Sequence, residues 1–397
     1  MKEYVQPRKI AEIPARGATL TPRLFSHAAR IGRPMTAPFD EPLAKDRGAE
    51  SFSREEVRLA NRNHGMALEL MHHDITPTGM HYLLTHFDVP HIDQSAFRLS
   101  IGGLVATPMS LSLADIMDRP AKTMPVTLEC AGNGRAVHED RSRSMPWHHE
   151  AVGTSEWTGT PLAPLLEEAG IQKNAVEIAF TGADRGFDKA VEHNFGRSLT
   201  VEQAKDQNIM LVYAMNGQPL LPQHGAPLRL IVPGWYGMAS VKWLEDIEVL
   251  DHAYEGFQQV ETYRYRTSDD DTGVGVSQLR VKSLMVPPGL PDWYSRQRLV
   301  DSGKVRISGR AWSGGGAAIS RVEFSCDGKN WTNAHLGARS GPFAWTPWSC
   351  DWQAEPGNHE LLCRATDERG DTQPLTPPWD ISGFGNNAVQ RVPVTVR

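Results

Sequence analysis

The apolar and polar residues of this chain follow two different patterns on either side of about residue 255. Upstream, short alternating runs mix with short segments that have helix-like ends, without a regular succession of strand, helix and strand. Downstream, alternating runs follow one another between turns, and no helical segment separates them. The pattern predicts an α+β domain followed by an all-β sandwich.

The upstream half contains three segments with recognisable helix boundaries. Ser53 and Glu56 form a capping-box pattern at the start of a helix over residues 53–60. Ser112 is placed to cap a short helix that ends at Met117, and Pro161 and Gly170 bracket a third helix. Strands are expected at residues 97–101, 126–130, 176–180, 209–214, 228–232 and 241–249.

The downstream half has linker-like stretches at residues 269–273 and 287–291. Turns then separate short alternating strands at the spacing of a β-sandwich of immunoglobulin type. These strands are expected at residues 304–310, 319–325, 344–348, 359–366 and 391–397. With the length of 397 residues, we expect an irregular N-terminal arm at 1–60, a catalytic domain at 61–265 and the sandwich at 266–397.

Composition and charge exclude several classes of protein. The chain is 40% hydrophobic and 22% charged, as is ordinary for globular proteins, and its formal charge of −6 argues against a nucleic-acid partner. No apolar run is long enough to predict a membrane span. No export signal is recognisable, so we expect a cytoplasmic protein, or a periplasmic one if a signal has been removed.

Cysteines and histidines do not form a familiar metal-binding motif. The cysteines at 130, 326, 350 and 363 lie far apart, without the paired spacing of a zinc site. Histidines crowd residues 64–94, but their spacings match no common ligand set.

Cys130 nevertheless lies in a distinctive setting. An apolar run, Val126–Leu128, leads to this cysteine, and a turn built on Gly132, Asn133 and Gly134 follows. Arg135 places a positive charge nearby and is expected to favour the thiolate, which is the form that binds metals. The alternative is a buried structural cysteine, which is the common fate of an isolated free cysteine.

Further polar residues are concentrated between residues 216 and 243. His224, Arg229, Ser240 and Lys242 all lie beside strand ends or glycine turns, where charged side chains and backbone N–H groups can bind a phosphate. The alternative is an ordinary β-meander with surface charges. Tyr263 is a phenol flanked by charged residues just before the expected linker. Residues 147–157 form an aromatic-rich turn region, for which packing in the core is a sufficient explanation.

These segments together resemble the sulfite oxidase family of molybdenum enzymes. The similarity begins with the cysteine loop Cys130-Ala131-Gly132-Asn133-Gly134-Arg135 and is nearly continuous from about residue 80 to the C-terminus. It includes, in order, Trp147, Gly153-Thr154, Trp157, Gly159, 215–220, His224-Gly225, Pro227, Arg229, 232–234, 241–244, 310–316 and Val322-Glu323.

The resemblance implies a site around one molybdenum–molybdopterin cofactor per chain, without haem. Cys130 would be the protein's ligand to the metal, and Tyr263 and Arg135 would face the substrate. The residues implied to hold the cofactor are Tyr82, His86, Cys130, Asp184, His224, Arg229, Ser240, Val241 and Lys242.

Two departures from the family pattern concern the substrate pocket. Sulfite oxidases commonly have Arg-Asn-His where this chain has Leu84-Thr85-His86, and a second pocket arginine falls near Thr346. Loss of positive charge weakens the binding of a dianion such as sulfite, because each charge-assisted hydrogen bond contributes about 1.5–3 kcal/mol.

The resemblance implies an oxidoreductase that converts sulfite to sulfate by oxo transfer. Electrons would pass to an external acceptor such as a cytochrome, and the sandwich would form a homodimer. One alternative is a family member that acts on another small oxyanion or sulfur compound, namely a sulfane-sulfur dehydrogenase or a reductase of nitrate or methionine sulfoxide. The other alternative is a binding or assembly subunit without a cofactor.

Overall fold

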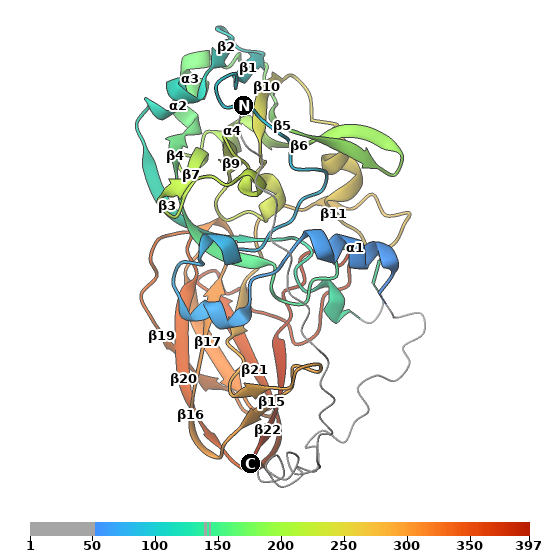
Figure 1. The fold of residues 1–397 in the computed structure, drawn as a ribbon, viewed down its shortest axis with the longest axis vertical. Coiled ribbons are helices and arrows are strands. Elements are labelled where there is room, and N and C mark those ends of the chain that lie inside the picture. Colours follow the sequence, from blue (N-terminus) through green and yellow to red (C-terminus); the bar gives the residue numbers. More distant parts are fainter. Residues whose placement is uncertain (1–51, 139–140, 143) are drawn as a thin grey trace, which may run out of the picture. The chain divides into compact units, whose positions relative to one another are not determined.

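The structure, a computed structural model, describes residues 52–397 with the exception of positions 139, 140 and 143. Most of the expected N-terminal arm lies outside the described residues. Two sheets with short helices form the first part of the described chain, and a β-sandwich forms the second (Figure 1). The α+β fold followed by a β-rich domain is therefore confirmed.

A five-stranded mixed sheet has the strand order β2-β1-β10-β5-β6. Strands β1 and β10 are parallel, and the other neighbours are antiparallel. The bounds are β1 Leu99–Gly103, β2 Met109–Leu111, β5 Glu177–Asp188, β6 Val191–Thr200 and β10 Leu244–Leu250.

The second sheet, here called the cysteine sheet, has the order β3-β4-β7-β8, and β9 also pairs with β7. Its bounds are β3 Lys122–Glu129, β4 Val152–Pro161, β7 Met210–Met215, β8 Gln218–Pro219 and β9 Arg229–Ile231. Strand β3 ends immediately before Cys130, so the sheet fixes where the cysteine loop begins.

The helices have the ends that their sequences predict. Ser53 and Glu56 make both capping-box hydrogen bonds at the start of α1, and Ser112 caps α2 in the same way. Helix α3 starts after Pro161 and ends at Gly170, which has the left-handed conformation (φ 70°) that glycine adopts easily. The bounds are α1 Arg54–Arg62, α2 Leu113–Met117, α3 Leu162–Ala169 and α4 Val201–Ala204.

Short helical turns connect these elements. A single π-helical turn, η9 Gln258–Thr262, directly precedes Tyr263. The 3₁₀ turns are η4 Leu68–His72, η5 Thr78–Met80, η6 Arg135–Val137, η7 Pro222–His224, η8 Gly237–Ala239 and η10 Gly314–Gly316.

The C-terminal part is a sandwich of a four-stranded sheet, β13-β16-β20-β19, and a six-stranded sheet, β14-β15-β22-β21-β17-β18. A small ribbon, β11-β12 (Arg264–Tyr265 and Val274–Gly275), precedes it. The sandwich bounds are β13 Lys282–Met285, β14 Leu290–Pro291, β15 Arg298–Val300, β16 Gly303–Trp312, β17 Ile319–Ser325, β18 Thr332–Asn333, β19 His335–Leu336, β20 Thr346–Ala354, β21 Gly357–Asp367 and β22 Gln390–Val396.

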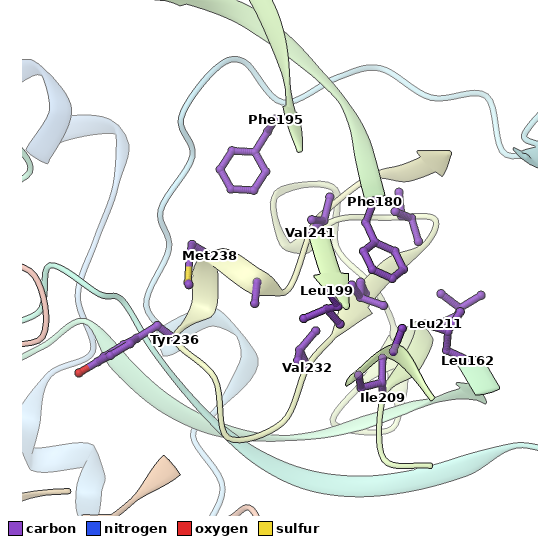
Figure 2. Packing of buried hydrophobic residues seen from close by; sticks show 14 of the residues in the cluster. Leu162, Phe180, Phe195, Leu199, Ile209, Leu211, Val232, Tyr236, Met238 and Val241 are labelled. Carbon is purple, nitrogen blue, oxygen red and sulfur yellow. The ribbon is translucent and has the colours of Figure 1, made fainter. Parts of the chain in front are cut away.

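Each part has its own apolar core. The sandwich encloses Trp348, Trp352 and Leu361, and the cysteine sheet buries Trp157 together with Cys130. The largest cluster joins the mixed sheet to the segments after β9 (Figure 2). In that cluster Phe180, Leu199 and Val241 pack closely, while Phe195 and Met238 also line the pocket described below.

Several local differences separate the sequence prediction from the structure. Residues 152–157 of the aromatic-rich region belong to the ten-residue strand β4, and the pattern did not predict β6 or shorter elements such as β2, β13, β15 and α4. The strand expected at 241–249 begins only at Leu244, because Trp243 takes a left-handed backbone conformation (φ 50°). This break in the extended chain separates Lys242 from β10.

Candidate functional site

Cys130 lies at the end of β3 and is buried, with 7% of its surface exposed. Its backbone N–H donates to the Ala151 carbonyl, and its own carbonyl accepts a hydrogen bond from the Asn133 N–H. Gly134 follows with a φ of 94°, which a residue with a side chain rarely adopts. The turn predicted after the cysteine is therefore present, with its backbone fixed.

A pocket opens beside the Cys130 side chain, with about 660 Å³ of atom-free space that includes space open to solvent. Its walls come from β3, the segment before β1, β5 and β6, and the loops around β9. The lining residues are His81, Tyr82, Leu83, Leu84, His86, Leu128, Cys130, Ala131, Asp184, Phe195, His224, Arg229, Gly237, Met238, Ser240, Lys242 and Tyr263.

Most residues proposed from the sequence come together in this pocket. The structure places Tyr82, His86, Cys130, Asp184, His224, Arg229, Ser240, Lys242 and Tyr263 in its walls. Val241 is instead fully buried in the apolar core, and Arg135 is not among the lining residues.

One end of the pocket is cationic. Arg229 donates from Nη1 to the His224 carbonyl (2.9 Å) and from Nη2 to the Ser240 carbonyl (3.1 Å). Lys242 Nζ donates to the carbonyls of Leu84 (2.9 Å) and Gln223 (3.2 Å). In the described part of the chain, neither cation forms a salt bridge with a carboxylate, so both positive charges are available to an anion.

Burial makes these charges costly without a ligand. It lowers the pKa of Arg229 to about 10, and burial together with the Arg229 charge lowers the pKa of Lys242 to about 7. Burial also lowers the pKa of His224 to about 3. A phosphate group would compensate this cluster because it supplies several acceptor oxygens and negative charge.

Buried polar atoms without partners provide a test of whether a pterin with its phosphate fits here. His81 Nε2, Asp184 Oδ1 and Arg229 Nε are buried and have no hydrogen-bond partner within the described residues, although buried polar atoms usually have one. They offer donors and acceptors for a polar heterocycle in the same pocket that contains the cationic end. A Cβ on Gly237 would collide with the Tyr82 hydroxyl, so glycine is required in this wall. The residues present fit such a group.

Tyr263 and His86 form a pair on another side of the pocket. The Tyr263 hydroxyl lies 2.7 Å from His86 Nε2, and the π-helical turn η9 ends immediately before the tyrosine. Burial lowers the pKa of His86 to about 3, so the imidazole is neutral near pH 7 and can accept the phenolic hydrogen bond. Burial raises the pKa of Tyr263, which therefore keeps its proton.

Arg135 lies beside the pocket rather than in its lining, and backbone carbonyls hold its guanidinium. Its Nε donates to the Ser382 carbonyl (2.6 Å) and its Nη1 to the Met145 carbonyl (2.6 Å), and its Cζ lies 5.4 Å from the centre of the Phe384 ring. A Cβ on Gly132 would collide with this guanidinium, so that glycine makes room for Arg135. In this structure Arg135 joins the cysteine loop to the segment around Ser382.

The Arg135 charge lowers the pKa of the Cys130 thiol, in the direction predicted from the sequence. Burial, which the sequence did not reveal, raises that pKa by more, so the net shift is upward. A coordinated metal ion would deprotonate the thiol directly.

The C-terminal sandwich also holds the cysteine loop. Lys282 of β13 is 1% exposed, and its Nζ donates to Glu129 Oε1 (2.8 Å) and to the carbonyls of Asn133 (3.3 Å) and Asn386 (2.8 Å). Trp312 donates to the other oxygen of Glu129 (2.9 Å). This buried ion pair, one residue before Cys130, connects the loop to the sandwich, and sequence reasoning did not identify it.

Sequence reasoning also missed several pocket residues. His81 lines the pocket beside the predicted Tyr82, and the local concentration of histidines was its only signal. Phe195 and Met238 carried no signal, because apolar residues in strands and turns usually indicate core. The same histidines form no metal site of their own: within the described ranges, no group of three or more His, Cys, Asp or Glu side chains could hold an ion.

The fold and pocket thus define a protein in which a buried cysteine, two buried cations and several unpartnered polar atoms line one pocket. Residues 86–258 match the family model for the oxidoreductase molybdopterin-binding domain. Residues 275–397 match the model for the Mo-co oxidoreductase dimerisation domain.

The chain is 33% identical to human mitochondrial sulfite oxidase in an alignment 345 positions long that covers 81% of this chain and 62% of that protein. It is 31% identical to the NADH nitrate reductase of Ulva prolifera in an alignment 348 positions long that covers 80% of this chain and 40% of that protein. The chain thus spans less than two thirds of these relatives. The crystal structure of the sulfane dehydrogenase SoxCD from Paracoccus pantotrophus matches with a TM-score of 0.72 and 26% identity, covering 93% of this chain and 98% of that one.

The chain belongs to the sulfite oxidase family of molybdenum-cofactor oxidoreductases. The resemblance inferred from the cysteine loop is confirmed, and so are the molybdopterin-binding domain and the dimerisation domain. Across the described residues, no helix is long and apolar enough to cross a membrane.

Proposed function

We propose that this protein oxidises sulfite to sulfate at a molybdenum–molybdopterin cofactor and passes the electrons to an external acceptor. The observation that carries the proposal is the pocket in which Cys130 faces a cationic end formed by Arg229 and Lys242. When bound, the cofactor supplies two-electron oxo-transfer chemistry, and the protein supplies orientation and charge.

The pocket residues have distinct proposed roles around this group. Cys130 would hold the molybdenum through Sγ, a soft ligand suited to such a metal. Arg229, Lys242 and His224 would bind the phosphate of the pterin cofactor, and Asp184 Oδ1, which has no partner among the described residues, would accept a hydrogen bond from it.

Tyr263 and His86 orient the substrate in our proposal. Because His86 is neutral near pH 7, the Tyr263 hydroxyl keeps its proton and its position through the 2.7 Å contact with Nε2. The phenol can then share its hydrogen with a substrate oxygen while the imidazole prevents it from rotating away. Orientation of this kind contributes to the rate because the reacting atoms are held in place before the reaction.

A second candidate substrate is a sulfane sulfur compound. Leu83, Leu84, Leu128 and Phe195 line the pocket, and Leu84 replaces an arginine that sulfite oxidases commonly have. Apolar walls suit a less charged sulfur substrate better than a dianion. The structural match to the sulfane dehydrogenase SoxCD over 93% of this chain supports the same alternative.

Metal analysis coupled to dye reduction tests these proposals. The purified full chain should contain close to one molybdenum per chain and should reduce an artificial acceptor when sulfite is added. Activity with glutathione persulfide but not sulfite would select the second candidate. A molybdenum content far below one per chain would refute both and favour a cofactor-free subunit.

We also propose a homodimer formed through the sandwich, which the match of residues 275–397 to a dimerisation domain supports. A monomeric mass by light scattering across micromolar concentrations would contradict this proposal.

A further inference from the structure

Arg197 is a buried cation beside the pocket that neither the sequence motifs nor the proposed mechanism uses. It lies on β6, is 4% exposed, and follows the pocket-lining Phe195 by two residues. Residues two apart on a strand face the same side of the sheet. Arg197 therefore lies on the face of β6 that carries the pocket wall.

The guanidinium of Arg197 contacts the segment that presents Tyr263 at two places. Its Nη1 donates to the carbonyl of Gln258, the first residue of the π-helical turn η9 (2.5 Å). The same carbonyl accepts from the Tyr263 backbone N–H (3.3 Å), so it fixes both ends of the turn. The Arg197 Cζ also lies 5.5 Å from the centre of the Tyr263 ring, within cation–π range.

Stability alone is a poor explanation for this arginine. In the described part of the chain Arg197 forms no salt bridge, and its Nε is buried without a hydrogen-bond partner. Burying a cation without a counter-ion costs several kcal/mol, and an apolar side chain of similar volume is often at least as stable. Single π-helical turns occur frequently at functional sites, which fits a role in presenting the tyrosine.

Other contacts hold either the Tyr263 ring or the turn η9. Phe384 stacks on the ring with centroids 5.2 Å apart, and His86 contacts the hydroxyl. The turn itself is also held by hydrogen bonds from Gln258 to His193 (3.0 Å), from Gln259 to Ser198 (2.9 Å) and from Arg266 to the Val260 carbonyl (3.1 Å). Arg197 differs from these side chains because it contacts both the backbone of the turn and the ring.

We propose that Arg197 is a positioning residue for Tyr263: it fixes the turn η9 and the phenol ring so that the hydroxyl stays on His86 and toward the substrate. This inference rests on the proposed function for the role of Tyr263 in turnover, but the placement of the ring can be measured without any substrate.

The test uses Arg197→Met, which leaves a shorter unbranched apolar side chain without charge or hydrogen bonds, and Arg197→Lys, which keeps the charge but replaces the planar guanidinium with an ammonium group. Arg266→Met is the matched control, because Arg266 Nη2 also donates to a carbonyl of η9, that of Val260 (3.1 Å), without a cation–π contact to Tyr263. Each variant carries 3-fluorotyrosine at position 263, introduced by stop-codon suppression into the full chain.

Fluorine NMR reports the placement of the ring directly. We expect Arg197→Met to shift or broaden the position-263 resonance, Arg197→Lys to give a smaller change, and Arg266→Met to leave it in place. The same order should appear in kcat without fluorotyrosine, with a loss of roughly 10–100-fold for Arg197→Met and a smaller change in KM, because misplacing an orienting group by about 1 Å can cost about 100-fold.

An unchanged resonance in both Arg197 variants would overturn the inference, and so would an equal change in Arg266→Met. If Arg197→Met does not fold, Arg197→Lys decides, because the single ammonium nitrogen of lysine replaces the planar fork through which Arg197 contacts the Gln258 carbonyl and the ring. The NMR result stands even if no tested substrate is turned over, so failure of the proposed function is distinguishable from failure of this inference.

Discussion

Replacement of Lys282 with methionine measures how strongly the sandwich holds the cysteine loop. Lys282 and Glu129 are both almost completely buried, and their charged atoms are 2.8 Å apart. Without Lys282, the Glu129 carboxylate keeps only the Asn133 amide (3.0 Å) and the Trp312 indole (2.9 Å) as donors from the described residues. The variant therefore leaves a carboxylate buried without a counter-charge.

The expected size of the effect follows from this burial. Removing one partner of a buried ion pair costs about 3–5 kcal/mol. At about 2–4 °C per kcal/mol for a domain of this size, the melting temperature should fall by about 6–20 °C. Because Lys282 also donates to the Asn133 carbonyl in the cysteine loop, we expect the molybdenum content of the purified variant to fall as well.

Differential scanning calorimetry and metal analysis check this prediction against two controls. Lys304→Met removes the partner of Asp351 in an exposed pair (71% and 43% exposed), where about 0–1 kcal/mol is expected. The double variant Glu129→Gln with Lys282→Met removes both charges and should recover most of the lost stability. The reasoning fails if Lys282→Met melts within about 1 °C of the parent chain, or if Lys304→Met is equally destabilised.

Four further predictions follow from the site and the sandwich. Cys130→Ser should abolish turnover without lowering the melting temperature by more than a few degrees, and near-normal activity would remove Cys130 as the metal ligand. In cofactor-free protein, burial raises the pKa of Asp184 from 3.8 to about 7, so the folded state keeps a proton that the unfolded chain loses. The free energy of unfolding should therefore fall as the pH rises from about 4 to about 7. Asp184→Asn should reduce that fall in pH-dependent calorimetry, and an identical pH dependence in the variant would contradict the raised pKa of Asp184. Tyr263→Phe should lower kcat roughly 100-fold with an unchanged fold, as expected for loss of a positioned proton donor, and an unchanged kcat would exclude it from the site. Trp293 and Tyr294, between β14 and β15, are 77% and 78% exposed. Replacing both with serine should raise the dissociation constant of the proposed homodimer, measured by analytical ultracentrifugation. An unchanged dissociation constant would place the dimer interface elsewhere.

The helix ends and the sandwich strands could be predicted from the sequence because they depend on local chemistry. The capping box of Ser53 and the Pro161–Gly170 boundaries act over three or four residues, so they appear wherever those residues occur. The alternating strands of the sandwich were predicted for the same reason, since one face is buried and the other is solvated. Strand β6 was missed because its first residues are exposed or half-exposed and polar, so pairing with β5 determines its conformation.

The residues that line the site were largely predictable, but their arrangement was not. Cys130, His224, Arg229 and Lys242 lie beside turns and strand ends, and the family motifs that contain them favoured a site over a structural cysteine and surface charges. Their common pocket depends on strand pairings between distant segments. The left-handed backbone of Trp243, which separates Lys242 from β10, has no signal in the pattern.

Tertiary structure decided the roles of the charges. Sequence proximity suggested that Arg135 acts on the Cys130 sulfur, and its charge does lower the pKa of that thiol. The fold adds what the sequence did not show, the hydrogen bonds of its guanidinium to the carbonyls of Ser382 and Met145. Lys282 lies far from Glu129 in the chain, and only the packing of the sandwich against the cysteine loop brings them together. The sequence by itself determined the family, the cysteine and the cationic residues, because the motifs that carry the family resemblance are short and depend on residue type and order. Which charge meets which partner depends on burial and on contacts between distant segments, and these exist only in the folded chain.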